Sequence, residues 1–211
     1  SLSELKVITG TKDALRVQTI GQKIAVAANQ PNYKWEFNLV EDNQANAFCL
    51  PGGKVVVYTG ILKYAKNDDQ LATVISHEVA HALARHGAER VTQGMIQQGV
   101  GLIGSVAVAA TAPQYQNAFN QAYGLGSNLG VMLPYGRMQE SEADEIGIYL
   151  MHKAGYNVNE ATKFWENMSE GKSGGNDFFS THPSSQNRTK DIQTVINKIG
   201  NEPKWIDSNI N

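Results

Sequence analysis

The segment VISHEVAHALARH, residues 74–86, holds three histidines and one glutamate within an apolar pattern of helical spacing. On a helix, His77 and His81 lie four residues apart, so both imidazoles project from one face, one turn apart. The surrounding apolar positions are Leu71, Val74, Ile75, Val79 and Leu83. A partly buried pair of imidazoles needs polar partners, and a metal ion supplies them. The segment therefore predicts an internal helix that carries two ligands of a metal site.

Glu78 adds a second kind of chemical group to this helix. In the pattern HExxH, both histidines can reach one zinc ion at about 2.0–2.1 Å, while the glutamate can reach a water held by that ion. We therefore predict one zinc ion per chain, with His77 and His81 as ligands and Glu78 as general base. The alternative is a helix that carries these residues by chance, which the apolar surroundings disfavour.

His86 is the third histidine of the segment. Residues 67–69, Asn-Asp-Asp, are typical of a helix start, because capping side chains and negative charge suit the unpaired N–H groups there. We expect the helix to run on to about residue 91. His86 would then lie nine residues from His77 and point to the opposite side of the helix. We therefore predict that His86 is a solvated surface residue and not a ligand.

A third ligand must come from elsewhere, and RMQESEADEIGIYLM, residues 137–151, is the best candidate. Glu140 and Asp144 are four residues apart on a predicted helix, so they share a face. Glu140 can bind zinc while Asp144 accepts a hydrogen bond from the second nitrogen of a ligand histidine, which fixes the imidazole tautomer. The alternative is an acidic helix start favoured by the helix dipole. Glu142 and Glu145 should point into solvent.

Periodicity predicts an α+β fold that is mostly helical, with a small sheet near the N-terminal end, in a single domain over residues 1–211. Alternation in YKWEFNLVED, residues 33–42, indicates a strand, and two apolar runs that flank residues 51–53 indicate a hairpin. Residues 171–186 should form a loop, and residues 94–134 a helical segment followed by a mobile loop. The other expected helices cover about residues 11–29, 137–153, 159–170 and 187–199.

Composition excludes several classes of protein. With 41% apolar and 18% charged residues, the chain can bury a core and is not expected to be disordered. A net charge of -2 argues against a general polyanion binder, so no nucleic-acid partner is expected. Cys49 is the only cysteine, which excludes an internal disulfide and a cysteine zinc cluster. The apolar run at residues 99–112 is shorter than the about 20 residues that span a bilayer, so a buried or interfacial helix is expected.

Four stretches together resemble a known family of zinc metallopeptidases. HEVAH is followed, 59 residues after His81, by Glu140 and an ExxAD-type pattern that ends at Asp144. The other stretches are NAFCLPGGKVVVYTGIL (46–62), GIYLMHKAGYNVNEATKFWENM (147–168) and STHPSSQNR (180–188). From about residue 15 to residue 199, the chain resembles the family that includes HtpX, BepA, LoiP, OMA and the CAAX prenyl proteases. It is most similar to the soluble periplasmic members, although Cys49 stands where alanine is common.

The resemblance implies a zincin-like metalloprotease domain in which Glu140 is the third zinc ligand and Asp144 supports the site. It implies a zinc-dependent endopeptidase that hydrolyses peptide bonds of unfolded or misfolded proteins, in quality control of a bacterial cell envelope. We therefore expect a periplasmic protein whose export signal has been removed, with peripheral membrane association as an open alternative. The rival function, from another class, is a non-proteolytic, chaperone-like binding module with a capped zinc site.

Two residues of the STHPSSQNR stretch have open roles. In similar proteins a histidine of this element can approach the zinc and block it, so His182 either caps the metal or packs a turn before Pro183. Arg188 can pair with a carboxylate of the site, stabilise an oxyanion or anchor the final helix, and His182 is a second candidate oxyanion donor. We count both as candidate catalytic residues, with Glu78 and Asp144.

Hydrolysis requires an extended peptide substrate. We predict that the run Val55, Val56 and Val57, or residues 47–50 beside it, forms a sheet edge to which the substrate adds as a further strand. The alternative is an ordinary core strand. Residues 94–134 are rich in glycine, which permits movement, and can act as a lid over the site. The competing account of that segment is a packing helix.

Overall fold

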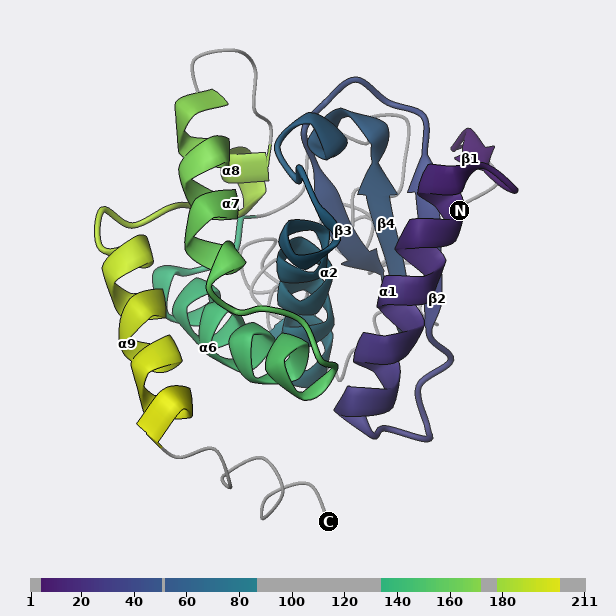
Figure 1. Ribbon diagram of the computed structural model, residues 1–211. Coiled ribbons are helices and arrows are strands. Elements are labelled where there is room, and N and C mark those ends of the chain that lie inside the picture. The colour runs from purple at the N-terminus through teal and green to yellow at the C-terminus, as the bar shows by residue number, and fades with distance from the viewer. Residues whose placement is uncertain (1–4, 51, 87–133, 172–177, 202–211) are drawn as a thin grey trace, which may run out of the picture.

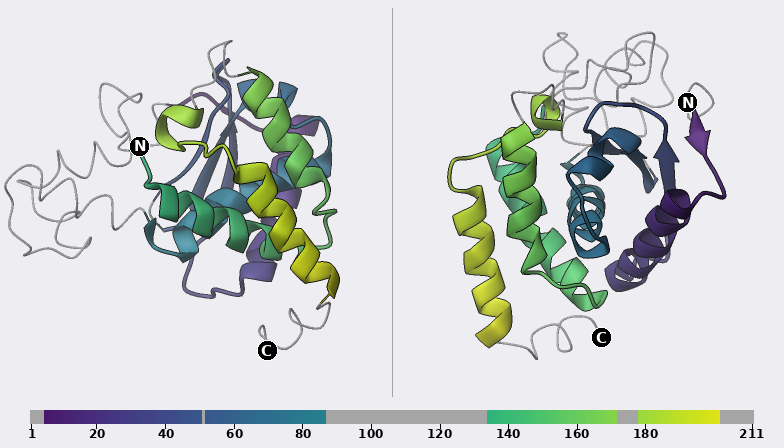
Figure 2. Two further views of the ribbon diagram at one scale, coloured as in Figure 1. Left: turned by 90° about the vertical axis from the view of Figure 1, so that its left-hand side faces the viewer. Right: turned by 45° about the horizontal axis from the view of Figure 1, so that its top comes forward.

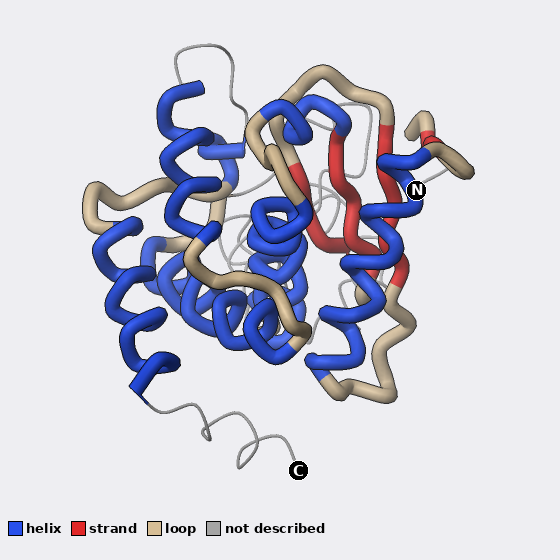
Figure 3. Tube along the Cα trace, viewed as in Figure 1, coloured by secondary structure: helices blue, strands red, loops and turns tan. Residues whose placement is uncertain are grey.

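Figure 1 shows the computed structural model, which describes residues 5–50, 52–86, 134–171 and 178–201. The fold is α+β and mostly helical, as the sequence predicted. Its elements are β1 (Val7–Ile8), α1 (Lys12–Ala28), β2 (Glu36–Val40), β3 (Ala47–Leu50), β4 (Lys54–Tyr58), a 3-10 turn (Thr59–Lys63), α2 (Asp68–Leu83), α6 (Arg137–Lys153), α7 (Glu160–Glu170), α8 (Phe178–Thr181) and α9 (Arg188–Asn201). The strands gather on one side of α2, and α6, α7 and α9 lie on the other (Figure 3).

The sheet has four strands in the order β1-β2-β4-β3. β2 and β4 run parallel, while β3 and β4 form the antiparallel hairpin that the sequence predicted. Gly52 and Gly53, in the turn, have φ angles of 85° and 99°, which favour glycine. α1 lies close to the sheet because Gly21 faces the Phe37 ring, where a Cβ would come within 2.1 Å of a ring carbon.

α1 begins and ends within one residue of its predicted bounds. The hydroxyl of Thr11 accepts a hydrogen bond from the N–H of Ala14, and Asn29 closes the helix in the left-handed conformation. In β2, Phe37 and Leu39 are buried, as the alternation predicted. Local sequence rules therefore account for α1 and β2.

α2 is the central helix, and every residue from position 70 to position 81 is buried. It begins as predicted, because the Asn67 side chain accepts a hydrogen bond from the N–H of Gln70, and two aspartates occupy the first turn. Since α2 packs against α1, the sheet, α6 and α7, its histidines lie in the interior and not on an exposed face.

The end of α2 differs from the prediction. The helix ends at Leu83, so the expected continuation to about residue 91 is wrong. Arg85 adopts a left-handed φ of 61°, which turns the chain off the helical path just before His86. The direction of His86 is therefore set by this turn and not by helical periodicity.

α6 has its predicted bounds and crosses α2 closely (Figure 2). The contact depends on Gly147, because a Cβ at this position would lie 3.2 Å from the backbone nitrogen of His77. A larger side chain would push the two helices apart. Gly147 thus sets the distance at which the acidic side chains of α6 reach the histidines of α2.

The C-terminal elements agree with the prediction apart from one short helix. α7 and α9 begin within one residue of the expected positions. The expected loop at residues 171–186 is wrong in part, because it contains α8, where Phe178 is fully buried and donates its N–H to the carbonyl of Ala45.

The predicted lid at residues 94–134 lies outside the described residues, apart from Pro134. Among the helices that the structure describes, none combines the length and the apolar character needed to cross a membrane.

Candidate metal centre

Four side chains from three parts of the fold converge on one buried point. They are His77 and His81 of α2, Glu140 of α6 and His182, which directly follows α8. Each offers one ligand atom, these atoms lie within 4.8 Å of one another, and each residue is at most 3% exposed. The structure thus brings together the three candidate ligands and also His182, whose role the sequence left open.

The spacing of the ligand atoms suits one small cation. Nε2 of His77 lies 3.1 Å from Nε2 of His81, and oxygens of Glu140 lie 3.1 Å and 2.9 Å from these two nitrogens. Ligands on a tetrahedral zinc ion, bound at about 2.0–2.1 Å, are separated by about 3.3 Å. Imidazole nitrogens together with a carboxylate oxygen are donors that zinc commonly takes. The donor set therefore fits zinc.

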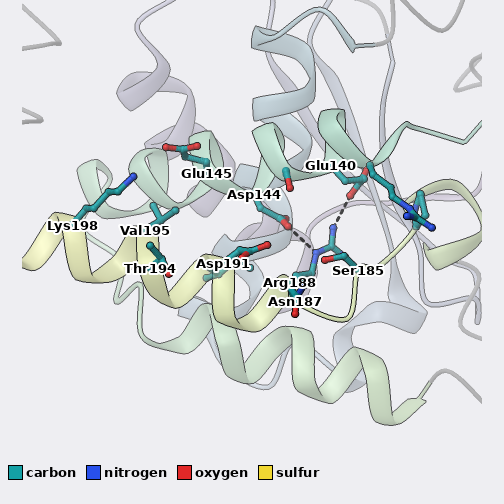
Figure 4. Close-up of a pocket in the computed structure, with 14 residues that line it drawn as sticks. Glu140, Asp144, Glu145, Ser185, Asn187, Arg188, Asp191, Thr194, Val195 and Lys198 are labelled. Carbon is teal, nitrogen blue, oxygen red and sulfur yellow. Dashed lines mark hydrogen bonds and ion pairs between the residues drawn. The ribbon is translucent and has the colours of Figure 1, made fainter.

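A buried ion-pair network fixes the two carboxylates of α6. Asp144 Oδ1 lies 2.9 Å from Nδ1 of His77. Arg188, at the start of α9, donates from Nε to Asp144 at 2.8 Å and from Nη2 to Glu140 at 2.6 Å (Figure 4). The guanidinium carbon also lies 4.1 Å from the centre of the Trp165 ring. Of the roles that the sequence left open for Arg188, the geometry favours pairing with the site carboxylates.

The electrostatics of the cluster place two of the three candidate ligands, Glu140 and His81, in the protonation state that binds a metal. Burial opposes ionisation of Glu140, but the neighbouring imidazoles of His182 and His77 hold the pKa of its carboxyl well below the usual range. Burial lowers the pKa of His81 well below its usual value, so this ring is neutral. Burial would also lower the pKa of His77, but Glu140 and Asp144 raise it to about 10. Metal binding at His77 therefore displaces a proton.

Glu78 is fully buried beside the cluster. Its Oε1 lies 3.2 Å from Nε2 of His182. The other nitrogen of the same ring, Nδ1, lies 2.7 Å from Glu140 and 3.3 Å from Nε2 of His77. The imidazole of His182 therefore stands between the candidate base and the candidate metal ligands.

Aromatic rings hold two of the imidazoles. The Phe178 ring stacks on His182 with centroids 4.0 Å apart and an interplanar angle of 5°. Tyr135 stacks on His81 at 3.7 Å and 11°, and its N–H donates to the carbonyl of Thr181. Sequence reasoning missed both aromatic residues. The i, i+4 spacing of Phe178 and His182 is a signal that could have found the first, whereas no spacing rule connects Tyr135 to the histidines of α2.

His86 lies in the interior, so the prediction of a solvated surface residue is wrong. It is 1% exposed, and its Nδ1 lies 2.9 Å from Nδ1 of His81. Its Nε2 lies 2.9 Å from an oxygen of Glu142. The physical reason is the early end of α2. The left-handed turn at Arg85 changes the direction of the chain, so that His86 packs against His81. Glu142 is exposed as predicted, but it is paired.

The valine run Val55, Val56 and Val57 is not at a sheet edge. These residues belong to β4, which lies between β2 and β3, so both of its edges are paired. All three side chains are fully buried, and the prediction that they receive a substrate strand is wrong. The alternative stretch, residues 47–50, is β3, which ends the strand order and lies against α2.

A pocket of about 390 Å³ opens between α6 and α9 (Figure 4). Glu140, Asp144 and Arg188 form part of its wall, and Glu145 and Lys198 also line it. Glu145 is exposed, as predicted. The pocket therefore gives access to the ion pairs that fix the carboxylates.

A helix with an HExxH pattern that meets a carboxylate from a second helix is the arrangement typical of zinc metallopeptidases. The comparison with family models is more specific, since the model of peptidase family M48 matches residues 11–196. The chain belongs to peptidase family M48, and zinc is its cofactor.

Several curated proteins are similar to the chain. It is 38% identical over 182 residues to the mitochondrial metalloendopeptidase OMA1 of Schizosaccharomyces pombe, covering 85% of this chain and 52% of that protein. It is 39% identical over 169 residues to the mitochondrial metalloendopeptidase OMA1 of Arabidopsis thaliana, covering 79% and 32%. It is 28% identical over 189 residues to the β-barrel assembly-enhancing protease of Escherichia coli, covering 87% and 39%. The chain thus spans about half, or less, of the length of these relatives.

Proposed function

We propose that the chain is the catalytic part of a zinc-dependent metalloendopeptidase that hydrolyses peptide bonds of proteins. His77, His81 and Glu140 hold the zinc ion, and Glu78 is the general base. The observation that carries the proposal is the convergence of these groups. Ligand atoms from α2 and α6 lie within 3.1 Å of one another, and a buried carboxylate sits next to the first histidine along α2.

When bound, zinc polarises the carbonyl of the scissile bond and lowers the pKa of a water molecule toward about 7. Glu78 accepts the proton of the attacking water and returns it to the leaving amine. Asp144 holds the ring of His77 through its outer nitrogen. Arg188 keeps the carboxylates of Asp144 and Glu140 in position. In this account Arg188 and Asp144 are positioning residues.

His182 closes the site in the arrangement described. A zinc site with four protein ligands is closed, whereas a catalytic site keeps one position open. Nδ1 of His182 lies among the candidate ligand atoms and would be a fourth ligand with zinc bound, while its Nε2 lies 3.2 Å from Glu78. Withdrawal of this one ring frees both the open position and the base. Once withdrawn, the His182 ring is a candidate donor to the oxyanion of the tetrahedral intermediate.

The substrates that we propose are unfolded or misfolded proteins, acted on in the periplasm of a bacterial envelope. One relative is named a mitochondrial metalloendopeptidase and another a β-barrel assembly-enhancing protease, which supports protein substrates. An extended substrate would add to β3, whose outer edge has no strand partner among the described residues. Peripheral association with the membrane is a further part of this proposal.

A second candidate function is a non-proteolytic, chaperone-like binding module with a permanently capped zinc site. The observation that favours it is the position of the His182 ring, which contacts both Glu140 and Glu78. Under this alternative, the four ligands form a structural site and Glu78 has no water to activate.

Casein cleavage by three zinc-loaded proteins separates the two functions. We expect cleavage by the wild type or by His182→Ala, and a loss on the order of 10²–10⁴-fold in Glu78→Gln, the range that general acid–base catalysis supplies. Glu78→Gln should keep one zinc per chain. His152→Ala, at the C-terminal end of α6, is the matched histidine control and should behave as the wild type. If the wild type and His182→Ala are both inert with one bound zinc, the binding module is favoured. Full activity of Glu78→Gln would remove Glu78 from its role.

A further inference from the structure

The outer nitrogen of His81 has a partner that the metal site alone does not explain. Nε2 of His81 faces the ligand cluster, and its Nδ1 is hydrogen-bonded to Nδ1 of His86 at 2.9 Å. The second nitrogen of His86, Nε2, is hydrogen-bonded to Oε2 of Glu142 at 2.9 Å. His86 is 1% exposed, while the side chain of Glu142 is 57% exposed. A continuous chain of contacts therefore links the candidate zinc ligand to a carboxylate at the surface.

When His81 binds a metal, only one placement of protons satisfies both hydrogen bonds in the series from His81 to Glu142. A neutral imidazole that offers Nε2 to a metal carries its proton on Nδ1. That N–H must donate to Nδ1 of His86, which is then the acceptor. The proton of His86 is consequently on Nε2, where it donates to the carboxylate of Glu142. Each hydrogen bond thus fixes the next, and the series ends on an acceptor-only group.

We propose that His86 and Glu142 are positioning residues that hold His81 in the orientation and tautomer required of a zinc ligand. This inference rests on the proposed function of the site. The hydrogen bonds from His81 through His86 to Glu142 correspond, at the second histidine, to the direct contact between His77 and Asp144. Outer partners of this kind orient a ligand ring and raise its basicity. His81 differs from His77 because its carboxylate acts through a second imidazole.

The backbone around His86 supports a dedicated arrangement. Arg85 has a left-handed φ of 61°, a conformation that is unfavourable for residues other than glycine. The turn lies between the end of α2 at Leu83 and His86, and it brings the His86 ring to the outer nitrogen of His81. Tyr135 stacks on the His81 ring at 3.7 Å. The ring is thus held at its edge by a hydrogen bond and across its plane by an aromatic contact.

Zinc affinity tests the inference, because it can be measured without any peptidase assay. The dissociation constant is determined by competition with a chromophoric chelator, and the geometry is followed by the visible spectrum of the Co²⁺-substituted protein. For His86→Ala we expect zinc binding weaker by about 10–100-fold, the range typical of lost outer partners. His86→Asn should recover part of this loss, because its side-chain oxygen can accept from Nδ1 of His81.

Glu142→Gln keeps the test decisive where the buried variant fails to fold. Glu142 is exposed, so its substitution leaves the packing intact. We expect a weaker zinc affinity by less than about tenfold, since the amide oxygen still accepts but carries no charge. The matched control is Glu145→Gln, which removes an equal charge from an exposed position of the same helix.

The results separate this inference from the proposed function. Equal zinc affinities of Glu142→Gln and Glu145→Gln, or no recovery in a folded His86→Asn protein relative to His86→Ala, would overturn the inference even if casein is cleaved. Weaker zinc binding in the His86 and Glu142 variants of a protein that cleaves nothing would support it, while the proposed endopeptidase function fails.

Discussion

Two parts of the molecule meet at the metal centre, and they are held in very different ways. α2 and α6, the scaffold pair, carry the three candidate zinc ligands and pack backbone to backbone at Gly147. Residues 178–182, the blocking segment, consist of the four-residue helix α8 and His182. Main-chain hydrogen bonds such as that from Phe178 to Ala45 join this segment to the fold.

The difference separates metal binding from the control of access. Ligands must be held within about 0.5 Å of a productive geometry, and long packed helices provide that precision. A residue that blocks the site must be able to leave, and a short element with few main-chain bonds opens at a lower free-energy cost than a central helix. The scaffold pair therefore suits the metal, and the blocking segment suits a switch.

The largest effect, on the free energy of unfolding, should follow from removal of the Arg188 side chain, whose guanidinium pairs with both carboxylates of α6. Arg188→Ala leaves Glu140 and Asp144 buried without the guanidinium that pairs with both. We expect the free energy of unfolding of the metal-free protein to fall by about 3–5 kcal/mol, the cost of breaking a buried ion pair. With zinc bound the loss should be smaller, because the metal ion compensates the charge of Glu140. Urea denaturation with and without zinc measures both values.

Arg16→Ala is the control for this prediction. Arg16 pairs with Asp13 and Asp68, but at a partly exposed position. Exposed ion pairs contribute about 0–1 kcal/mol, so this substitution should change the free energy of unfolding little. Equal losses in Arg16→Ala and Arg188→Ala would mean that the buried network does not stabilise the scaffold pair.

The second prediction compares ligands from the two parts directly. Glu140→Gln removes the charged ligand of the scaffold pair, and its zinc affinity should fall by more than about 100-fold, beyond the range of lost outer partners. His182→Ala leaves three ligands in place, so its affinity should fall by less than about tenfold. Chelator competition measures both constants. A larger loss in His182→Ala would reverse the comparison and make His182 a principal ligand.

Sequence predicted the scaffold pair well because its rules are local. Helical spacing placed His77 and His81 on one face, Asn67 marked the start of α2, and α6 has its predicted bounds. The meeting of Glu140 with the histidines required the spacing within α6 and the resemblance to a known family. What the sequence could not specify is the close crossing at Gly147, which depends on two helices far apart in the chain.

The wrong predictions concern residues whose position depends on long-range strand order or on an irregular turn. The edge role of Val55, Val56 and Val57 failed because strand order is a property of the whole sheet, and no pattern within β4 reports that it lies between β2 and β3. Helical periodicity places His86 at the surface, because the left-handed turn at Arg85 has no glycine to signal it. Both errors concern the surroundings of the site and not the ligands of the scaffold pair.

The third prediction alters the helix crossing itself. Gly147→Val should lower the free energy of unfolding by about 1–3 kcal/mol, because the added side chain meets the backbone of His77 and Ser76. Zinc affinity should fall as well, since α6 is displaced from α2. Gly200→Val, in α9, is the matched control, because a Cβ there meets no atom within 4 Å. Unchanged zinc affinity in Gly147→Val would show that the ligands tolerate a shift of the scaffold pair.

The smallest effect should come from loosening the blocking segment. The Phe178 ring stacks on His182 at 4.0 Å, and such pairs contribute about 0.5–1.5 kcal/mol beyond the area that they bury. Phe178→Leu keeps an apolar side chain but removes the stack. The population of the open form, in which His182 is withdrawn from the site, should therefore rise by up to about tenfold. Casein cleavage should rise accordingly, while zinc affinity should fall no further than in His182→Ala, because the three ligands of the scaffold pair stay in place. Phe179→Leu, at the neighbouring position of α8, is the control. Because the closed-to-open ratio alone is expected to move, a joint fall of cleavage and zinc affinity in Phe178→Leu would mean that the blocking segment also supports the metal.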